Sequence, residues 1–121
     1  MKPEKQVEHS IIRFLNIIGW DVHVYESKAA WSVRAGKFLK NRSLVEGHPD
    51  IAGCDKYGRA VYIELKAKGI KAVRKKQYDF LKRKIELNCL AGVVRSVEEF
   101  KTLLGMDKAE MLVWLDSFTV K

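Results

Sequence analysis

Residues 47–66, with the sequence GHPDIAGCDKYGRAVYIELK, predict a β-hairpin. A short apolar run ends at Cys54, and a second run, in which β-branched and aromatic residues alternate with others, begins at Ala60. Polar residues typical of turns lie between the two runs. Since Gly58 can adopt a positive φ at low cost, we expect residues 56–58 to form a three-residue hairpin loop.

This loop fixes the pairing of the two strands and sets Asp50 directly opposite Glu64. Directly opposed residues of an antiparallel pair project from the same face, with Cβ atoms roughly 5 Å apart. Because side chains alternate along a strand, Lys66 lies on that face together with Glu64. The hairpin is therefore expected to bring two carboxylates and one ammonium group together.

This pair of carboxylates predicts a divalent-cation site. Two carboxylates at such a separation repel each other, so they are a poor choice for stability alone. Mg²⁺ binds one or two carboxylates and keeps water in its other positions, and a bound cation lowers the pKa of that water. Lys66 would then orient the water or stabilise charge on a phosphate. The alternative is that Asp50 is a turn residue and that Glu64 and Lys66 form an ordinary polar strand face.

The spacing of these residues resembles a known nuclease signature. Pro49-Asp50, thirteen intervening residues and Glu64-Leu65-Lys66 are similar to the motif of the PD-(D/E)xK nuclease superfamily. More narrowly, the chain resembles the VRR-NUC family over residues 4–105. The residues that carry the narrower resemblance are Gly47-His48-Pro49-Asp50, Glu64-Leu65-Lys66, Gln77 and Val93-Val94-Arg95-Ser96. Ser96 stands where the family has the second arginine of its Val-Arg-Arg run.

The resemblance implies an α/β protein with a restriction-endonuclease-like αβββαβ core, in which helices flank a mixed central sheet. It also implies an endonuclease that depends on Mg²⁺ or Mn²⁺, cleaves DNA to leave a 5′-phosphate, prefers branched DNA such as Holliday junctions, and works as a homodimer. The implied metal ligands are Glu8, Asp50, Glu64 and the Leu65 carbonyl. The implied catalytic residues are Glu8, Asp50, Glu64, Lys66 and Gln77.

Glu8 lies in a segment, 4–18, whose apolar spacing predicts a helix that ends at Gly19. On this helix Glu8 lies at the flank of the buried stripe, where a carboxylate can reach the edge of the core. Its distance of eleven residues from Gly19 is similar to that of the helix-borne glutamate in archaeal Holliday-junction resolvases. Glu4, one turn earlier, is the rival, and a solvated glutamate is the plain alternative.

Composition narrows the class of protein. With 121 residues and 47% hydrophobic residues, the chain predicts one globular domain, 1–121, with no membrane-spanning segment. Cys54 and Cys89 are expected to be buried, reduced thiols, which favours a cytoplasmic location. The formal net charge of +8 favours a polyanionic partner, above all nucleic acid.

Cations are concentrated in two segments. The first, the loop 27–46, interleaves them with Trp31 and Phe38, so it could follow a phosphate backbone and stack a base, or could be a solvated loop anchored to the core. The second follows Lys66 and predicts a phosphate-binding rim, with a solvated charged surface as the alternative. The candidate nucleic-acid-binding residues are Arg34, Lys37, Lys40, Arg42, Lys68, Lys71, Arg74, Lys75 and Lys76.

The remaining elements are predicted from their apolar patterns. We expect a strand over 20–25 with Val22 and Val24 inward, a helix over 73–87 with Gln77 directed at the site, and a strand over 90–95. The Arg95 side chain, at the end of that strand, is expected to bind a carboxylate or phosphate, or to form a structural ion pair. Capping boxes are expected from Ser96 to Glu99 and from Asp107 to Glu110. The end of the chain, 106–121, is expected to be a helix or tail that packs on the core or meets a second subunit.

Two other functions fit the same sequence. A nucleic-acid-binding module without catalysis would need the positive charge but not the carboxylates. A metal-free RNase would act through His23 or His48 and would be indifferent to chelation. The choice between DNA and RNA, and between branched and linear substrates, is left open by the residues themselves.

Overall fold

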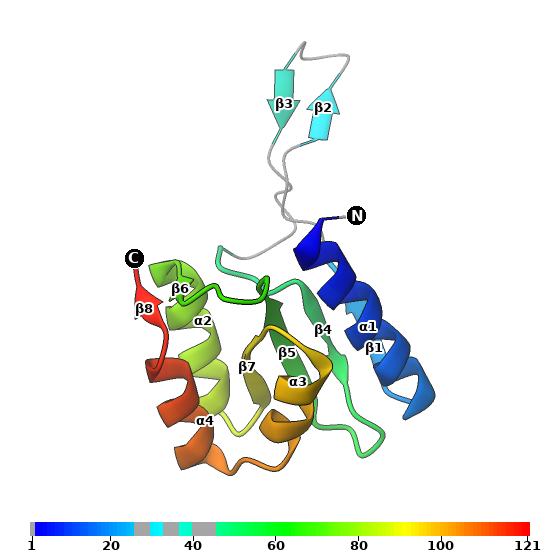
Figure 1. Cartoon of the computed structure of the whole chain (residues 1–121), viewed down its shortest axis with the longest axis vertical. Coiled ribbons are helices and arrows are strands. Elements are labelled where there is room, and N and C mark those ends of the chain that lie inside the picture. The colour runs from blue at the N-terminus through cyan, green and yellow to red at the C-terminus, as the bar shows by residue number, and fades with distance from the viewer. Residues whose placement is uncertain (1, 26–29, 33–36, 40–45) are drawn as a thin grey trace.

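The computed structural model describes residues 2–25, 30–32, 37–39 and 46–121. These residues form a mixed α/β structure (Figure 1), which confirms the predicted class. The elements are α1 (Pro3–Ile17), β1 (Asp21–Val24), β2 (Ala30–Ser32), β3 (Lys37–Leu39), β4 (Ile51–Cys54), β5 (Ala60–Leu65), β6 (Ala72–Val73), α2 (Lys75–Glu86), β7 (Leu90–Val94), α3 (Val97–Leu104), α4 (Lys108–Asp116) and β8 (Thr119–Val120).

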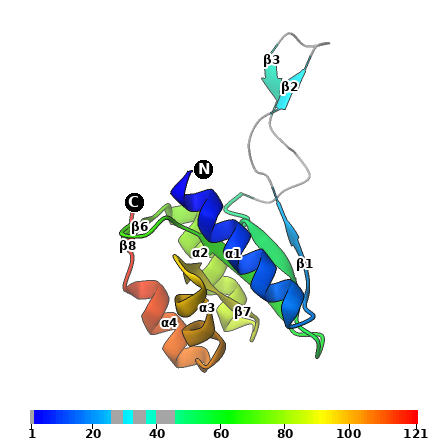
Figure 2. The same ribbon diagram turned by 45° about the vertical axis from the view of Figure 1, so that its right-hand side comes forward.

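The main sheet has the strand order β1-β4-β5-β7. β1, β4 and β5 are antiparallel neighbours, whereas β7 runs parallel to β5 after the crossover through α2. α1 packs with α3, and α2 packs with α4 (Figure 2). α3 covers the face of the sheet to which Ile63 belongs, because Leu103 of α3 contacts Gly92, the residue paired with Ile63. α2 covers the other face, where its Gln77 side chain contacts Glu64. Helices therefore flank the sheet on both faces.

The predicted hairpin register is confirmed. β4 and β5 pair from Ile51 opposite Ile63 to Cys54 opposite Ala60. At the loop, the Asp55 N–H donates to the Arg59 carbonyl at 2.9 Å, and Gly58 has a φ of +85°. The period-2 pattern and a single turn glycine were sufficient to predict this pairing.

The core forms where the apolar faces of the helices meet the sheet. In α1, Ile11 and Leu15 are buried, and in α2, Leu81 and Ile85 are buried, as the helical spacing predicts. Every residue of β7 is buried, which is typical of a parallel strand covered on both faces. None of the helices in the described parts of the chain is long and apolar enough to cross a membrane.

Several local predictions are wrong. Val24 is 42% exposed, because it ends β1 at the edge of the sheet, whereas Val22 packs against the core. The helix expected from residue 73 begins at Lys75, since Ala72–Val73 form β6 and pair with β8. Cys54 and Cys89 are free but only partly buried.

The basic loop expected over 27–46 contains two strands, β2 and β3, which pair with each other to form a small sheet of their own. The rest of that segment, apart from residue 46, lies outside the described residues. Among the loop residues predicted to bind nucleic acid, Arg34, Lys40 and Arg42 lie outside the described residues, and Lys37 is described only by its backbone in β3.

The C-terminal segment packs back on the core. Met111, Leu115 and Phe118 are buried, and the Asp107–Glu110 capping box is formed in full. β8 then pairs with β6, and the Lys75 N–H donates to the Lys121 carbonyl at 2.8 Å. The end of the chain therefore holds the segment that leads into α2.

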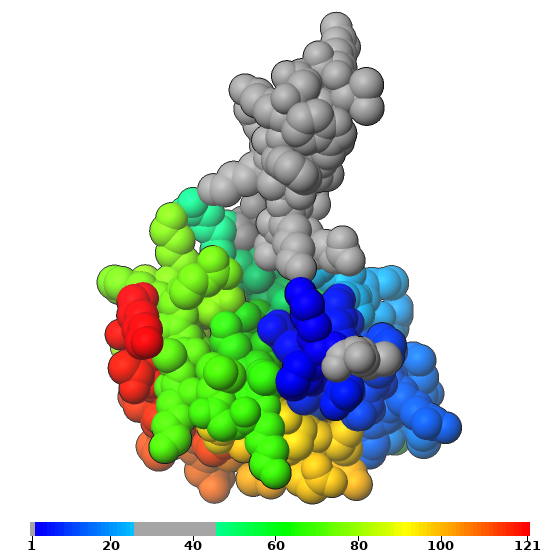
Figure 3. Space-filling view, turned by 45° about the horizontal axis from the view of Figure 1, so that its top comes forward, coloured from blue at the N-terminus to red at the C-terminus, as the bar shows by residue number. Residues whose placement is uncertain are grey.

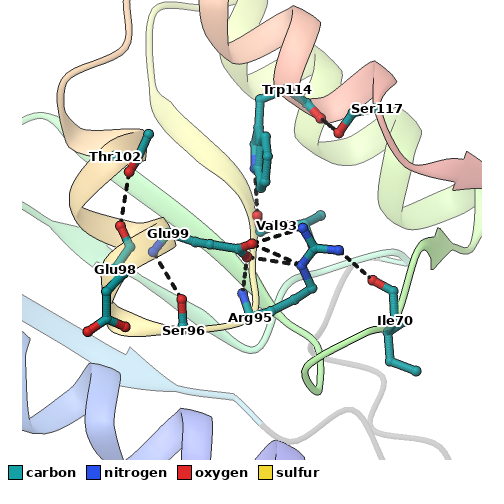
Figure 4. A network of polar contacts seen from close by, with 9 residues as sticks. All are labelled: Ile70, Val93, Arg95, Ser96, Glu98, Glu99, Thr102, Trp114 and Ser117. Atoms are coloured by element: carbon teal, nitrogen blue, oxygen red, sulfur yellow. Dashed lines mark hydrogen bonds and ion pairs between the residues drawn. The ribbon is translucent and has the colours of Figure 1, made fainter.

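Arg95 is a structural residue (Figure 4). Its guanidinium forms an ion pair with Glu99 at 2.8 Å and donates to the Ile70 carbonyl at 2.9 Å. It also lies 5.6 Å from the ring centroid of Trp114 and 5.1 Å from that of Phe118. Because Glu99 is engaged with Arg95, only half of the expected capping box forms, in which the Ser96 hydroxyl accepts from the Glu99 N–H. The structural ion pair is therefore the alternative that holds.

Gly47 allows a close approach between the loop before Asp50 and the start of α2. It has a φ of +78°, and a Cβ atom there would lie 2.2 Å from the Lys76 carbonyl oxygen. We expect Gly47→Ala to lower the free energy of unfolding by about 2 kcal/mol or more, because it combines an unfavourable φ with overlap against backbone. Urea unfolding measures this loss.

Gly58→Ala is the matched control for this substitution. Gly58 also has a positive φ, +85°, but none of the residues that the structure describes has an atom within 4 Å of a Cβ atom there. Its variant should show only the conformational cost of about 1–2 kcal/mol. Equal losses in the two variants would contradict the close approach at Gly47.

Candidate active site

The open end of the β4–β5 hairpin places Asp50 opposite Glu64. Asp50 directly precedes β4, and its backbone N–H donates to the Glu64 Oε1 atom at 3.2 Å. The Leu65 N–H in turn donates to the Asp50 Oδ2 atom at 2.9 Å. Each carboxyl group is thus held by the backbone of the facing strand, and the predicted juxtaposition is present.

Gln77 and Lys66 complete the surroundings of Glu64. The Gln77 Nε2 atom donates to Glu64 Oε2 at 2.5 Å, and the Lys66 Nζ atom lies 3.5 Å from the same oxygen. The Gln77 Oε1 atom accepts from Lys66 Nζ at 3.3 Å and from the Arg74 N–H at 3.2 Å. The amide of Gln77 therefore joins the carboxylate, the ammonium and the first turn of α2.

Burial makes the ionisation of Glu64 unfavourable. The residue is 4% exposed, and desolvation, followed by the negative charge of Asp50, raises its pKa from 4.5 to about 8. A hydrogen bond with the Asp50 side chain also raises the pKa, and the Lys66 ammonium offsets only part of the effect. A cation placed between the two carboxyl groups would remove this penalty.

The oxygen donors at this point suit a hard divalent cation. Asp50 and Glu64 supply carboxylate oxygens and Leu65 a nearby carbonyl, a set to which Mg²⁺ would add water. Among the described residues, however, no three His, Cys, Asp or Glu side chains form a group that could hold a metal ion. Glu8 is partly buried on α1, where its carboxylate pairs with Lys5 at 3.1 Å, and within the described residues it belongs to no such group. Glu4 is exposed on the first turn of the same helix.

The predicted basic rim lies on the surface beside this site. The segment after β5, green in Figure 3, is exposed between α1 and the C-terminal end of the chain. Lys68, Lys71 and Arg74 are exposed, and within the described residues no ion pair engages them. Lys75 and Lys76 are also exposed, but each ammonium faces a carboxylate, that of Asp79 at 3.0 Å and that of Glu46 at 2.8 Å.

Sequence reasoning missed the aromatic side chains that border the site. The rings of Tyr25 and His48 have centroids 4.6 Å apart, those of His48 and Phe80 5.6 Å, and those of Phe80 and Tyr62 5.5 Å. The position of Tyr62 could have been predicted, because strand alternation places it on the same face as Glu64. The contact between His48 and Phe80 could not have been predicted, because it depends on how α2 packs against the sheet.

The two histidines of the RNase alternative have different surroundings. His48 is packed between Tyr25 and Phe80, with its Nδ1 atom 2.8 Å from the Pro49 carbonyl oxygen. His23 has a side chain that is 67% exposed and lies 3.7 Å from Asp21.

We expect the stability of the metal-free protein to fall as the pH rises from 4.5 to about 8, the ordinary and folded-state pKa values of Glu64. The folded protein holds this proton more tightly than the unfolded chain, so its advantage is complete below the lower value and lost above the higher one. The contribution of Glu64 has a limiting slope of about 1.4 kcal/mol per pH unit. Urea unfolding in the presence of chelator measures it.

Glu64→Gln removes the titrating group. As the pH rises, the difference in free energy of unfolding between this variant and wild type should therefore shift steadily in favour of the variant. The amide nitrogen cannot accept from Gln77, but that cost does not depend on pH and leaves the divergence of the two curves unchanged. Glu4→Gln, which removes an exposed carboxyl group, is the control. Parallel curves for Glu64→Gln and wild type would show that Glu64 does not carry a raised pKa.

Comparisons of the chain with protein-family models, with curated proteins and with solved structures find no match. The resemblance to the VRR-NUC family therefore stays a hypothesis carried by the motif residues. The geometry around Asp50 and Glu64 is the basis on which a function is inferred.

Proposed function

We propose that this protein is a divalent-metal-dependent endonuclease that hydrolyses DNA phosphodiester bonds. The observation that carries the proposal is the set of contacts among Asp50, Glu64, Lys66 and Gln77. The order α1-β1-β4-β5-α2-β7 and the mixed sheet support the restriction-endonuclease-like αβββαβ core that the family resemblance implies. Two opposed carboxylates with an adjacent lysine have little value for stability but suit phosphodiester hydrolysis.

In the proposed mechanism Asp50, Glu64 and the Leu65 carbonyl would hold Mg²⁺ or Mn²⁺. The bound ion would supply positive charge at the scissile phosphate and a water of lowered pKa. Lys66 would orient the attacking water, and Gln77 is a positioning residue, because it fixes both Lys66 and Glu64. Attack in line with the 3′ oxygen would form the new P–O bond, break the P–O3′ bond and leave a 5′-phosphate.

The nucleic-acid partner is supported by charge. The net charge of +8 and the exposed rim of Lys68, Lys71 and Arg74 favour a polyanion, which the rim would contact along its phosphates. Branched DNA such as a Holliday junction, and cleavage by a homodimer, are refinements that rest on the family resemblance. DNA is preferred to RNA on the same ground.

Lys66→Ala and Asp50→Asn should abolish cleavage and leave most of the affinity for nucleic acid. Chemistry needs the cation and its water, whereas affinity depends on many phosphate contacts. The substrates are a four-way DNA junction, a linear duplex of matched sequence and the corresponding RNA, each with Mg²⁺, Mn²⁺ or chelator. Asn at position 50 can still accept from the Leu65 N–H, so the fold should be retained.

Lys56→Ala is the matched control for these variants, since it removes an exposed lysine from the closed end of the same hairpin. It should cleave and bind as wild type does. Cleavage at near wild-type rate by either site variant would refute the assignment of the active site, and cleavage in chelator would refute the need for a cation.

Charge reversal of Lys68 and Lys71 should flatten the salt dependence of binding. Each phosphate contact that is lost lowers the slope of log K against log salt by about 1. Reversal of Lys75 and Lys76 should have a smaller effect, because those ammonium groups already face Asp79 and Glu46. Anisotropy titrations across a range of salt concentrations compare the two double variants. Equal slopes for wild type and the Lys68 and Lys71 reversal would place the rim away from the nucleic acid.

A further inference from the structure

A row of aromatic side chains borders the candidate active site. It consists of Tyr25, His48, Phe80 and Tyr62, each in ring contact with the next. The Tyr25–His48 and Phe80–Tyr62 contacts are edge-to-face, with interplanar angles of 64° and 75°, and the His48–Phe80 contact is tilted at 57°. His23 extends the row beyond Tyr25 at 6.5 Å. We call these residues the aromatic row. Tyr25 directly follows β1, His48 lies in the loop before β4, Phe80 lies in α2 and Tyr62 in β5, so the fold gathers the row from separate parts of the chain.

Three residues of the aromatic row lie two or three positions from an active-site residue in the sequence. His48 precedes Asp50 by two residues, and Tyr62 precedes Glu64 by two residues on the same face of β5. Phe80 follows Gln77 by three residues, one turn along α2. Since the site residues contact one another, the aromatic residues beside them are brought to the edge of the same site.

None of the residues of the aromatic row is fully buried. Tyr25, His48, Tyr62 and Phe80 are all partly buried rather than buried, unlike the apolar residues on the opposite face of β5, Val61 and Ile63, which are 0% exposed. In an edge-to-face pair one ring presents only its edge, so its own face is not used by that contact. The described part of the chain therefore leaves the row only partly covered, although Tyr62 and Phe80 also pack against the core.

A cation lies over one end of the aromatic row. The Lys84 Nζ atom is 5.0 Å from the Tyr62 ring centroid and 5.1 Å from that of Phe80. Lys66 lies on the Tyr62 face of β5, beside Glu64. Aromatic surface flanked by ammonium groups is the combination that binds single-stranded nucleic acid, because bases stack on the rings and phosphates pair with the cations.

We propose that the aromatic row stacks an unpaired nucleobase, on a nucleotide next to the phosphate at the active site. The occupant is single-stranded nucleic acid or an unpaired stretch within a duplex, since a base inside an intact duplex has its faces covered by its neighbours. The position of this base relative to a scissile phosphate rests on the proposed nuclease function. The stacking itself does not require cleavage and is testable without a metal.

The probe is a fluorescent single-stranded oligonucleotide of about 12 nucleotides, a length within the range of known single-strand sites. Binding is measured by anisotropy in chelator for the intact strand, for the matched duplex and for strands with one abasic position, scanned along the sequence. An abasic position removes the ring and keeps the phosphate. Wild-type protein should bind the intact strand about 5- to 100-fold more tightly than a strand that lacks the stacked base.

Tyr62→Leu and Phe80→Leu keep apolar volume and remove the ring. Each should weaken binding of the intact strand by a similar factor, leave the salt slope unchanged and have no further effect on the strand without the stacked base. Tyr62→Phe should bind as wild type does. Tyr57→Leu is the matched control, because Tyr57 is 83% exposed and has a lysine, Lys56, 5.2 Å from its ring centroid, at the far end of the hairpin.

The outcomes separate this inference from the proposed function. Metal-dependent cleavage together with equal binding of intact and abasic strands would contradict base stacking on the aromatic row and leave the proposed nuclease function intact. Binding that depends on the rings, without cleavage in Mg²⁺ or Mn²⁺, would support base stacking on the aromatic row and contradict the proposed nuclease function. The abasic scan uses wild-type protein, so it decides the matter even if a leucine variant fails to fold.

Discussion

Asp50 and Glu64 face each other across the open end of the β4–β5 hairpin, each accepting a hydrogen bond from the backbone of the opposite strand. Burial and the neighbouring charge raise the pKa of Glu64 to about 8, so the folded protein holds this carboxyl group under an electrostatic penalty. The surrounding contacts limit that penalty without removing it. Gln77 donates to Glu64 and accepts from Lys66, and its own position depends on the first turn of α2.

The location of α2 is in turn fixed by contacts remote in sequence. Gly47 permits the loop before Asp50 to approach the Lys76 carbonyl, and β8 pairs with β6 immediately before the helix. Arg95, which lies over the rings of Trp114 and Phe118, donates to the Ile70 carbonyl in the segment that leads to β6. Residues without any direct part in chemistry thus hold the site in one arrangement, as preorganised sites require.

The hairpin and the buried face of α2 could be predicted from sequence because both depend on local rules. A turn glycine and a period of two fix the strand register, and a period of 3.6 places Gln77 on the inward face with Leu81. The exposure of Val24 could not be predicted, because alternation says which residues share a face and not how far the helices cover it. The pairing of β6 with β8 joins two-residue strands distant in sequence, which leave no periodic pattern.

The site residues were predicted unevenly for the same reason. Asp50, Glu64 and Lys66 follow from the register of one hairpin. Glu8 depends on how α1 is placed against the sheet, and in the structure it pairs with Lys5 instead of joining the two carboxyl groups. The sequence does not decide whether Arg95 binds a phosphate or forms a structural ion pair, because the positions of Glu99, Trp114 and Phe118 around it are set only by packing.

The central claim is that Asp50 and Glu64 form a carboxyl pair that a divalent cation relieves. Carbon-13 NMR titration of the Glu64 carboxyl group, with and without Mg²⁺, tests it most directly. Without metal, Glu64 should titrate near pH 8, and saturating Mg²⁺ should lower that midpoint by competing with the proton. A midpoint near 4.5 in the metal-free protein, or a midpoint that Mg²⁺ leaves unchanged, would contradict the account.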